Sequence, residues 1–180
     1  FDAGDVMALA YQYVLREKFQ VAVTADALST LLGESPYAVL NTWLPKNEVK
    51  AAYELYKQVY PGFLKREGRL FDGVAQVLAQ LHGQGVCTGI VTSQTRARTG
   101  MVLKLLPALS SAAEVLVTYD DTVGRKKPDP YPIQLAVSRL STKPGTVFFV
   151  GDSISDIEDI HRAGAITVAV AWGLTPLPLL

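Results

Sequence analysis

Apolar residues in the first third of the chain recur at the three- and four-residue spacing of an amphipathic helix. Over residues 6–19, Tyr11, Val14 and Leu15 fall on one face of such a helix. Further on, Thr, Ser or Asn precedes apolar stretches, as at helix starts, and Gly or Pro follows them. We therefore predict helices over 25–32, opened by Thr24 and stopped by Gly33; from Ser35-Pro36 to a break at Pro45; and over 48–60, capped by Asn47 and ended by Pro61-Gly62.

After Phe71 the pattern changes, because short apolar runs rich in β-branched residues alternate with helical segments. The apolar runs predict buried strands over 86–91, 114–118, 146–150 and 166–170. The segments around them predict helices over 73–84, 95–106, 130–140 and 155–163. Strands that alternate with helices indicate a doubly wound parallel sheet, so we predict an α/β fold with a small all-helical unit before it.

The composition narrows the classes of protein to which this chain can belong. Its 180 residues include 17 Lys and Arg against 17 Asp and Glu, and the formal net charge of +0 excludes a strongly basic nucleic-acid binder. A single cysteine excludes an intrachain disulfide and a Cys-rich zinc site. No apolar run approaches the roughly 18 residues of a membrane helix, and no signal-peptide pattern is present. We therefore expect a soluble cytoplasmic protein.

The two ends of the sequence resemble the interior of a longer chain. Phe1-Asp2 reads like the last residues of a buried strand, and the stretch from Leu174 to Leu180 is apolar and lacks a polar cap. A central parallel strand needs about five residues. We therefore expect a hydrophobic segment before Phe1, and another strand and helix after Leu180.

Polar residues stand at the carboxyl ends of the predicted strands, where the functional groups of a parallel sheet collect. These residues are Asp2, Thr92-Ser93, Lys126-Lys127-Pro128 and Gly151-Asp152. A carboxylate, a hydroxyl, a lysine and a second acidic group at one edge suit phosphoryl transfer to a carboxylate nucleophile. In such chemistry a metal ion shields the charge between nucleophile and phosphate, while the lysine and the hydroxyl bind phosphoryl oxygens.

Four motifs in order along the chain resemble those of the haloacid dehalogenase superfamily, and within it the phosphoglycolate-phosphatase-like and pyrophosphatase-like branch with a helical cap. The motifs are Phe1-Asp2-Ala3-Gly4-Asp5-Val6-Met7, Gly89-Ile90-Val91-Thr92-Ser93, Lys127-Pro128-Asp129-Pro130 and Val150-Gly151-Asp152-Ser153-Ile154-Ser155-Asp156. The resemblance implies a Rossmann-like, doubly wound core over residues 1–7 and 71–180 and a helical cap over residues 8–70.

The same resemblance assigns roles to residues. It implies Asp2 as the catalytic nucleophile, which forms an aspartyl-phosphate, and Lys127 as the catalytic residue that steadies nucleophile and phosphate. It implies Thr92 and Ser93, together with Lys127, as substrate-binding residues. The implied activity is hydrolysis of a small phosphate monoester, dependent on Mg²⁺. The implied ligands of that metal are Asp2, the Gly4 carbonyl, Asp152 and Asp156.

One residue departs from the family pattern. Phosphatases of the family place a second Asp two residues after the nucleophile, where it protonates the leaving group and then activates water; here that position is Gly4, followed by Asp5. Loss of a general acid or base lowers the rate by about 10²–10⁴-fold. Asp5 replaces it only if the loop is rebuilt, because adjacent side chains point in different directions. The alternative is a catalytically impaired relative that binds a phosphorylated ligand or partner; a sugar phosphomutase would depend on the missing group still more.

Other polar residues also have simpler interpretations. Thr92 and Ser93 can cap the helix that follows them. Arg96 and Arg98 follow the second motif, where they can contact the substrate or form a solvated helix face, and we favour the solvated face. We interpret Cys87 as inert core inside a strand. We expect a small phosphorylated metabolite as the ligand, with neither nucleic acid nor membrane as partner; the oligomeric state has no signature in the sequence.

Overall fold

The computed structural model describes all residues except 3, 33, 126–128, 174 and 176–180, together with the side chains of 155 and 158–160. The chain forms two compact units, Phe1–Arg69 and Leu70–Leu180. The first is all-helical and the second contains parallel strands and helices. None of the helices described combines the length and the apolar character that crossing a bilayer requires.

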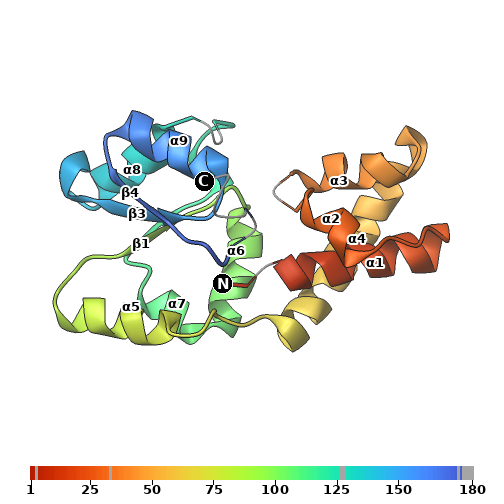
Figure 1. Ribbon diagram of the computed structural model, residues 1–180, viewed down its shortest axis with the longest axis horizontal. Coiled ribbons are helices and arrows are strands. Elements are labelled where there is room, and N and C mark those ends of the chain that lie inside the picture. The colour runs from red at the N-terminus through yellow and green to blue at the C-terminus, as the bar shows by residue number, and fades with distance from the viewer. Residues whose placement is uncertain (3, 33, 126–128, 174, 176–180) are drawn as a thin grey trace. The chain divides into compact units, whose positions relative to one another are not determined.

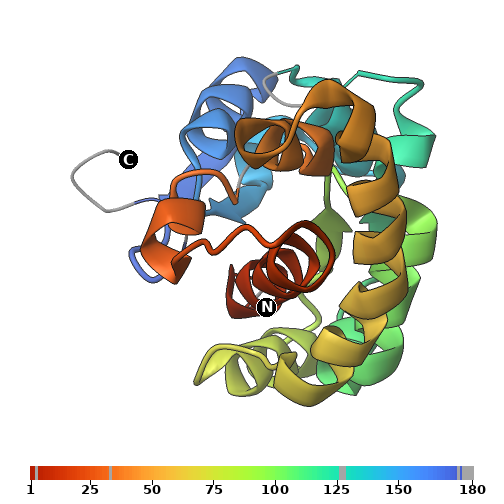
Figure 2. The same ribbon diagram turned by 90° about the vertical axis from the view of Figure 1, so that its right-hand side faces the viewer.

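The first unit is built around a long helix. Its elements are α1 (Gly4–Phe19), α2 (Ala25–Ser29), α3 (Pro36–Trp43) and α4 (Lys46–Glu67). Helix α4 packs against both α1 and α3 (Figure 2). Tyr11 of α1 stacks on Tyr56 of α4, with ring centroids 4.5 Å apart and an interplanar angle of 15°. Val14 and Leu15 are fully buried as well, which confirms the apolar face predicted for α1.

Capping contacts confirm two of the predicted helix starts. The Thr24 hydroxyl accepts a hydrogen bond from the N–H of Ala27 at 3.2 Å, and the Ser35 hydroxyl accepts one from the N–H of Ala38 at 3.3 Å. Each contact satisfies an N–H group of a first helical turn that has no partner within the helix. The stop predicted at Gly33 lies outside the described residues.

Helix α4 is longer than the sequence pattern predicts. Asn47 does not cap it, because the helix begins directly after Pro45, and Pro61 lies inside the helix rather than beyond its end. A proline in a helix interior removes one hydrogen bond and costs about 3 kcal/mol. Tyr60 and Leu64, on either side of Pro61, are buried, and burying two large side chains contributes about 3–6 kcal/mol. Burial of these side chains therefore offsets the cost of the proline, and the helix continues beyond it.

The second unit alternates strands and helices, and its α/β class is the one predicted. Its elements are α5 (Val74–Gly83), β1 (Gly89–Val91), α6 (Arg96–Leu105), α7 (Pro107–Ser111), β2 (Val115–Val117), the 3-10 helix η1 (Tyr119–Asp121), α8 (Tyr131–Arg139), the 3-10 helix η2 (Pro144–Thr146), β3 (Phe148–Gly151), α9 (Ile154–Ala163) and β4 (Ile166–Ala169). Strand β1 pairs with β2, and β3 with β4, in both cases parallel. Helices α8 and α9 lie on one side of the strands, and α5 and α7 on the other (Figure 1).

The strands are shorter and more exposed than predicted. Strand β1 begins only at Gly89, where the backbone closely approaches β2: a Cβ on Gly89 would lie 3.0 Å from the Val115 carbonyl oxygen. Cys87 therefore precedes the strand and is exposed, so its assignment to the core is wrong. Phe148 and Val150 of β3 are 66% and 60% exposed, because among the described residues each sheet has two strands and leaves side chains uncovered.

The N-terminal residues differ from the strand end predicted for them. Asp2 forms a single antiparallel bridge, in which its N–H donates to the Arg69 carbonyl at 3.0 Å, and α1 begins at Gly4. Residues 4–7 are therefore helical and belong to the same compact unit as the helices that follow. The assignment of residues 1–7 to the α/β core stays a prediction.

Candidate active site

A pocket lies at the carboxyl ends of β1 and β2, where the sequence predicts phosphate-binding hydroxyls. Its lining consists of Val91, Thr92, Ser93, Tyr119, Thr122, Arg125 and Pro132. The Thr92 N–H donates to the Val117 carbonyl at 2.9 Å, which extends the parallel pairing one residue beyond β1 and fixes the Thr92 backbone. The Thr92 hydroxyl accepts a hydrogen bond from the N–H of Gln94 at 3.2 Å. The two predicted hydroxyl residues, Thr92 and Ser93, thus lie in one pocket.

The interpretation of Thr92 and Ser93 as helix caps is wrong. The N-cap of α6 is Thr95, whose hydroxyl accepts a hydrogen bond from the N–H of Arg98 at 3.4 Å. Thr92 and Ser93 come before this cap and line the pocket instead. Their role in binding a ligand stays a prediction.

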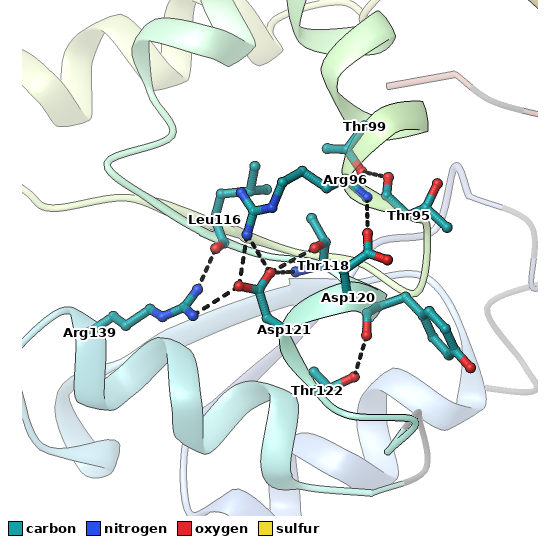
Figure 3. Close-up of polar contacts among 10 residues, drawn as sticks. Thr95, Arg96, Thr99, Leu116, Thr118, Asp120, Asp121, Thr122 and Arg139 are labelled. Carbon is teal, nitrogen blue, oxygen red and sulfur yellow. Dashed lines mark hydrogen bonds and ion pairs between the residues drawn. The ribbon is translucent and has the colours of Figure 1, made fainter.

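A network of ion pairs lies next to this pocket and is centred on Asp121 of η1 (Figure 3). The Asp121 carboxylate accepts hydrogen bonds from the hydroxyl and the N–H of Thr118 at 2.7 and 2.8 Å. Nη2 of Arg96 lies 2.7 Å from each carboxylate oxygen, and Nη2 of Arg139 lies 2.9 Å from one of them. The Thr118 hydroxyl and these cationic neighbours hold the pKa of Asp121 well below its ordinary value. The carboxylate is therefore ionised at neutral pH.

The network joins three elements around the carboxyl end of β2. Arg96 comes from the start of α6 and Arg139 from the end of α8, and Arg139 also donates to a carbonyl of β2 at 2.7 Å. Thr118 and Asp121 form a capping box that holds η1. Because η1 contributes Tyr119 to the pocket lining, the network fixes one wall of the pocket.

The loop after η1 brings a second ion pair to the pocket. Arg125 lines the pocket, and its Nε and Nη2 donate to the two carboxylate oxygens of Asp129 at 2.8 and 2.9 Å. Its guanidinium carbon lies 4.4 Å from the centroid of the Tyr131 ring. The Arg125 hydrogen bonds hold the pKa of Asp129 below its ordinary value. Residues 126–128 lie outside the described residues, so the roles of Lys127 stay predictions.

The carboxyl end of β3 carries the acidic turn that the resemblance implies as a metal site. Asp156 is buried in the first turn of α9, where its Oδ2 accepts hydrogen bonds from the N–H of Asp152 and from the N–H and hydroxyl of Ser153. Asp152 directly follows β3 and is half-buried against the backbone of Gly173, where an added Cβ would collide with it. Asp156 thus shapes the turn from which Asp152 extends.

The chemistry of these groups suits magnesium, which prefers carboxylate and other oxygen ligands. Among the residues that the structure describes, no group of three or more His, Cys, Asp or Glu side chains gathers to hold a metal ion. The predicted ligand set draws on both units, with Asp2 and Gly4 in the first and Asp152 and Asp156 in the second. That set therefore stays a prediction.

Asp2, the predicted nucleophile, shares a cationic partner with Asp5. One nitrogen of Arg69, Nη2, lies 3.2 Å from Oδ2 of Asp2 and 3.2 Å from Oδ2 of Asp5. The Asp2 side chain is the more buried of the two, at 19% exposure against 66%. The carboxylate that follows Gly4 in the sequence thus reaches the same guanidinium as the predicted nucleophile.

Three arginines beside these residues have no counterpart in the predicted site. Arg96 is exposed, which confirms its place on a solvated helix face, but its side chain also pairs with Asp121; Arg69 and Arg125 form the contacts given above. One local signal was present, since Thr118 and Asp121 have the spacing of a capping box. The Arg96–Asp121 pair joins residues 25 positions apart, and no local pattern predicts such a contact.

The chain is similar in sequence to several curated phosphatases. It is 29% identical over 174 residues to the phosphoglycolate phosphatase of Xylella fastidiosa, which covers 95% of this chain and 75% of that protein. It is 29% identical over 175 residues to the pyrophosphatase PpaX of Bacillus pumilus, which covers 96% of this chain and 79% of that protein. Both similarities extend through the helical and the α/β unit.

The fold and the family follow from two further comparisons. The solved structure of a haloacid dehalogenase-like hydrolase from Streptococcus pneumoniae matches with a TM-score of 0.85 at 18% identity, covering 98% of this chain and 82% of that one, so the two share a fold. The model of the family described as haloacid dehalogenase-like hydrolase matches residues 1–170, a range that includes all four sequence motifs. The chain therefore belongs to the haloacid dehalogenase-like hydrolases.

Proposed function

We propose that this hydrolase is a Mg²⁺-dependent phosphatase that cleaves a small phosphate monoester through an aspartyl-phosphate on Asp2. The observation that carries the proposal is the pocket at the carboxyl ends of β1 and β2, which contains Thr92 and Ser93. Hydroxyl and backbone N–H donors at such an edge suit a phosphoryl group. The relatives named phosphoglycolate phosphatase and pyrophosphatase support a small phosphorylated metabolite as the substrate.

The acidic turn after β3 supports the magnesium part of the proposal. When bound, Mg²⁺ supplies positive charge that lowers the repulsion between an attacking carboxylate and a phosphate. Asp152 would hold the ion directly, while Asp156, whose Oδ2 is engaged by three donors of the turn, would hold Asp152 in place. Asp2 and the carbonyl of Gly4 complete the proposed ligand set.

The proposed reaction has two steps, both at phosphorus. First, a carboxylate oxygen of Asp2 bonds to phosphorus, and the bond from phosphorus to the ester oxygen breaks. Thr92, Ser93 and Lys127 bind the phosphoryl oxygens during this step. Water then attacks the aspartyl-phosphate, which releases inorganic phosphate and restores Asp2. The leaving alcohol must gain a proton in the first step, and the water must lose one in the second.

Asp5 is the residue that we propose for these proton transfers. Gly4 occupies the position at which related phosphatases have their acid and base, and it carries no side chain. The carboxylates of Asp5 and Asp2 share one nitrogen of Arg69 at 3.2 Å each, which supports a position for Asp5 near the nucleophile. An exposed carboxylate can exchange protons with water, as the second step requires.

Gly4 also supports a second candidate function, which is binding of a phosphorylated ligand without turnover. The hydroxyls of the pocket and the carboxylate of Asp152 would serve such binding equally well. The Asp5→Asn variant separates the two candidates. Loss of a wild-type hydrolytic activity in this variant identifies Asp5 as the acid and base. Binding of phosphate esters by a wild-type protein that hydrolyses none of them identifies a binding protein.

The direct test is hydrolysis of 4-nitrophenyl phosphate with and without Mg²⁺. We expect Mg²⁺-dependent release of nitrophenol, and a fall in kcat/KM of about 10²-fold in Thr92→Val, because one donor to the phosphoryl group is lost. Thr142→Val removes an exposed hydroxyl outside the pocket and should leave kcat/KM unchanged. A Thr92→Val enzyme as active as Thr142→Val would contradict the proposed phosphate pocket.

Metal binding is measured separately, by calorimetric titration of Mg²⁺ into the wild type and into Asp152→Asn. Removing one carboxylate charge from a hard-cation site weakens the affinity. We therefore expect binding heat in the wild type and little in the variant. Equal heats in the two proteins would remove Asp152 from the ligand set, whatever the hydrolytic activity.

A further inference from the structure

Arg125 is the cationic side chain among the residues that line the described pocket, and its orientation is fixed from two directions. Nε and Nη2 form a two-pronged contact with Asp129, at 2.8 and 2.9 Å to separate oxygens. The face of the guanidinium rests on Tyr131, with 4.4 Å between the guanidinium carbon and the ring centroid. A guanidinium held at one edge and on one face has a defined direction for its remaining donors.

Those remaining donors are the ones that a ligand can use. A guanidinium carries five N–H groups, and the Asp129 contact engages one on Nε and one on Nη2. No contact of Nη1 with another group is found among the described residues. The side chain is about half exposed, so these donors are within reach of solvent. They therefore suit two oxygens of a carboxylate or a phosphate, the planar or tetrahedral oxyanions that arginine binds in pairs.

The neighbours of Arg125 in the pocket indicate which part of a ligand it would meet. Thr92 and Ser93, at the end of β1, are the proposed contacts of the reacting phosphoryl group, and they line the same pocket as Arg125. A small ester whose phosphoryl group lies at Thr92 therefore has Arg125 in the lining of the same pocket. An anionic group on the alcohol part of the ester would pair with the guanidinium, whereas a neutral alcohol part would leave the guanidinium hydrated.

We propose that Arg125 binds a second anionic group of the substrate, so that the enzyme prefers small phosphate esters or anhydrides whose leaving group itself carries a carboxylate or a phosphate. This inference rests on the proposed phosphatase function and adds the residue that selects the substrate class. Asp129 and Tyr131 act as positioning residues, because they contact Arg125 rather than the substrate. The pairing with Asp129 offsets part of the charge of Arg125, so the selection depends on hydrogen-bond geometry.

The test compares three compounds of similar size. 2-Phosphoglycolate has a carboxylate on its leaving group, pyrophosphate has a phosphate there, and ethyl phosphate has neither. KM and kcat are measured with Mg²⁺ for the wild type, Arg125→Gln and Arg125→Lys. The control, Lys104→Gln, removes one positive charge from an exposed position on α6, outside the pocket lining. Circular dichroism establishes that each variant is folded.

We expect Arg125→Gln to raise KM for 2-phosphoglycolate or pyrophosphate about tenfold, because a charged hydrogen-bonding partner is lost. KM for ethyl phosphate should change less than about twofold, and Lys104→Gln should match the wild type. Arg125→Lys should also raise KM for the anionic substrates, because an ammonium keeps the charge but not the paired donors. An effect confined to one of the two anionic compounds identifies the carboxylate or the phosphate as the group bound.

A binding measurement separates failure of this inference from failure of the proposed function. The three compounds are titrated calorimetrically into each protein in the presence of a chelator. Preferential binding of an anionic compound that Arg125→Gln abolishes, in a protein that hydrolyses none of the three, would overturn the phosphatase and keep the role of Arg125. Equal kinetics of wild type and Arg125→Gln on all compounds would overturn the role of Arg125 and keep the phosphatase. Absence of binding and hydrolysis with every compound would overturn both.

Discussion

Replacing Asp121 with Asn tests the claim that an ion-pair network fixes one wall of the pocket. Asn keeps the shape of the side chain, but one of its two terminal atoms becomes a donor. In the native network, Thr118 binds Oδ2, Arg139 binds Oδ1 and Arg96 binds both oxygens (Figure 3). The variant therefore turns an NH₂ group either toward Thr118 or toward the two arginines.

Burial determines which of these two arrangements costs less free energy. Thr118 is fully buried, so its N–H and hydroxyl cannot turn to water, and the amide oxygen should stay with them. The NH₂ group then faces Arg96 and Arg139, whose side chains are 55% and 38% exposed and can turn to solvent. Each of these partly exposed pairs contributes about 0.5–1 kcal/mol. Weakening of the charged hydrogen bonds to Thr118 adds about 1 kcal/mol.

We therefore expect Asp121→Asn to lower the free energy of unfolding by about 2 kcal/mol, or Tm by about 4–8 °C. Urea unfolding at pH 7, followed by far-UV circular dichroism, measures this change. Asp120→Asn is the matched control, because the exposed Asp120 carboxylate accepts from the N–H of Arg96 and an amide oxygen can still do so. The control should lose less than about 0.5 kcal/mol. Equal losses in the two variants would mean that the Asp121 network does not stabilise the fold beyond an ordinary exposed carboxylate.

The pH dependence gives a second, independent result from the same pair of proteins. The Thr118 hydroxyl, then its N–H and the two arginines, lower the folded-state pKa of Asp121 below the value of 3.8 for an unperturbed carboxyl. The ionised carboxylate thus contributes stability above that pH, and the contribution is lost as the pH falls through the folded-state pKa. The stability difference between wild type and Asp121→Asn should hold from pH 8 to 5 and shrink below about pH 4. A difference that grows on acidification would contradict the network.

Three further predictions concern other substitutions. Gly4→Asp should restore the hydrolysis that Asp5→Asn loses, more for alkyl than for aryl phosphates, because an alkyl leaving group needs a proton more; kinetics on the folded double variant check this, and no restoration on any ester would count against Asp5 as the acid and base. Pro61→Ala should stabilise α4 by about 1–3 kcal/mol in urea unfolding, since it restores one helix hydrogen bond, and a destabilised variant would mean that the proline ring itself packs. Tyr11→Ala should destabilise the helical unit by about 3–5 kcal/mol through loss of the Tyr56 stack, whereas Tyr13→Ala, at an exposed position, should cost under half as much.

Features with a short sequence range could be predicted from the sequence. Thr24 and Ser35 cap helices as expected, because each cap acts on an N–H only three residues away. The alternation of strands and helices likewise identified the α/β unit. Pro61 shows the limit of such signals. A local rule predicts that the helix ends at this proline, but the helix continues because the residues around Pro61 are buried. The exposure of Cys87 could not be predicted either, because it depends on the residue at which β1 begins to pair with β2.

In the candidate site, too, some features could be predicted from the sequence and others could not. The positions of Thr92 and Asp152 after strands were predictable, because parallel strands collect their carboxyl ends at one edge. The arginines were not, since Arg96 meets Asp121 across 25 positions of sequence and Arg69 meets Asp2 across 67. Such contacts depend on how elements pack against one another, and short-range sequence patterns do not predict that packing. The roles that the resemblance implies for Asp2 and Lys127 remain predictions for experiment.

Trapping the aspartyl-phosphate tests whether Asp2 carries the phosphoryl group during turnover. Wild type and Asp2→Asn are mixed with 4-nitrophenyl phosphate and Mg²⁺, quenched in acid, and compared by intact mass and peptide mapping. The acid quench stops the reaction before water attacks, so the phosphorylated enzyme formed in the first step is retained. We expect one added phosphoryl group on the wild-type peptide that contains Asp2, and none on the variant, which should also fail to release nitrophenol. Hydrolysis by Asp2→Asn at the wild-type rate, or a phosphoryl group on any other residue, would contradict this role of Asp2.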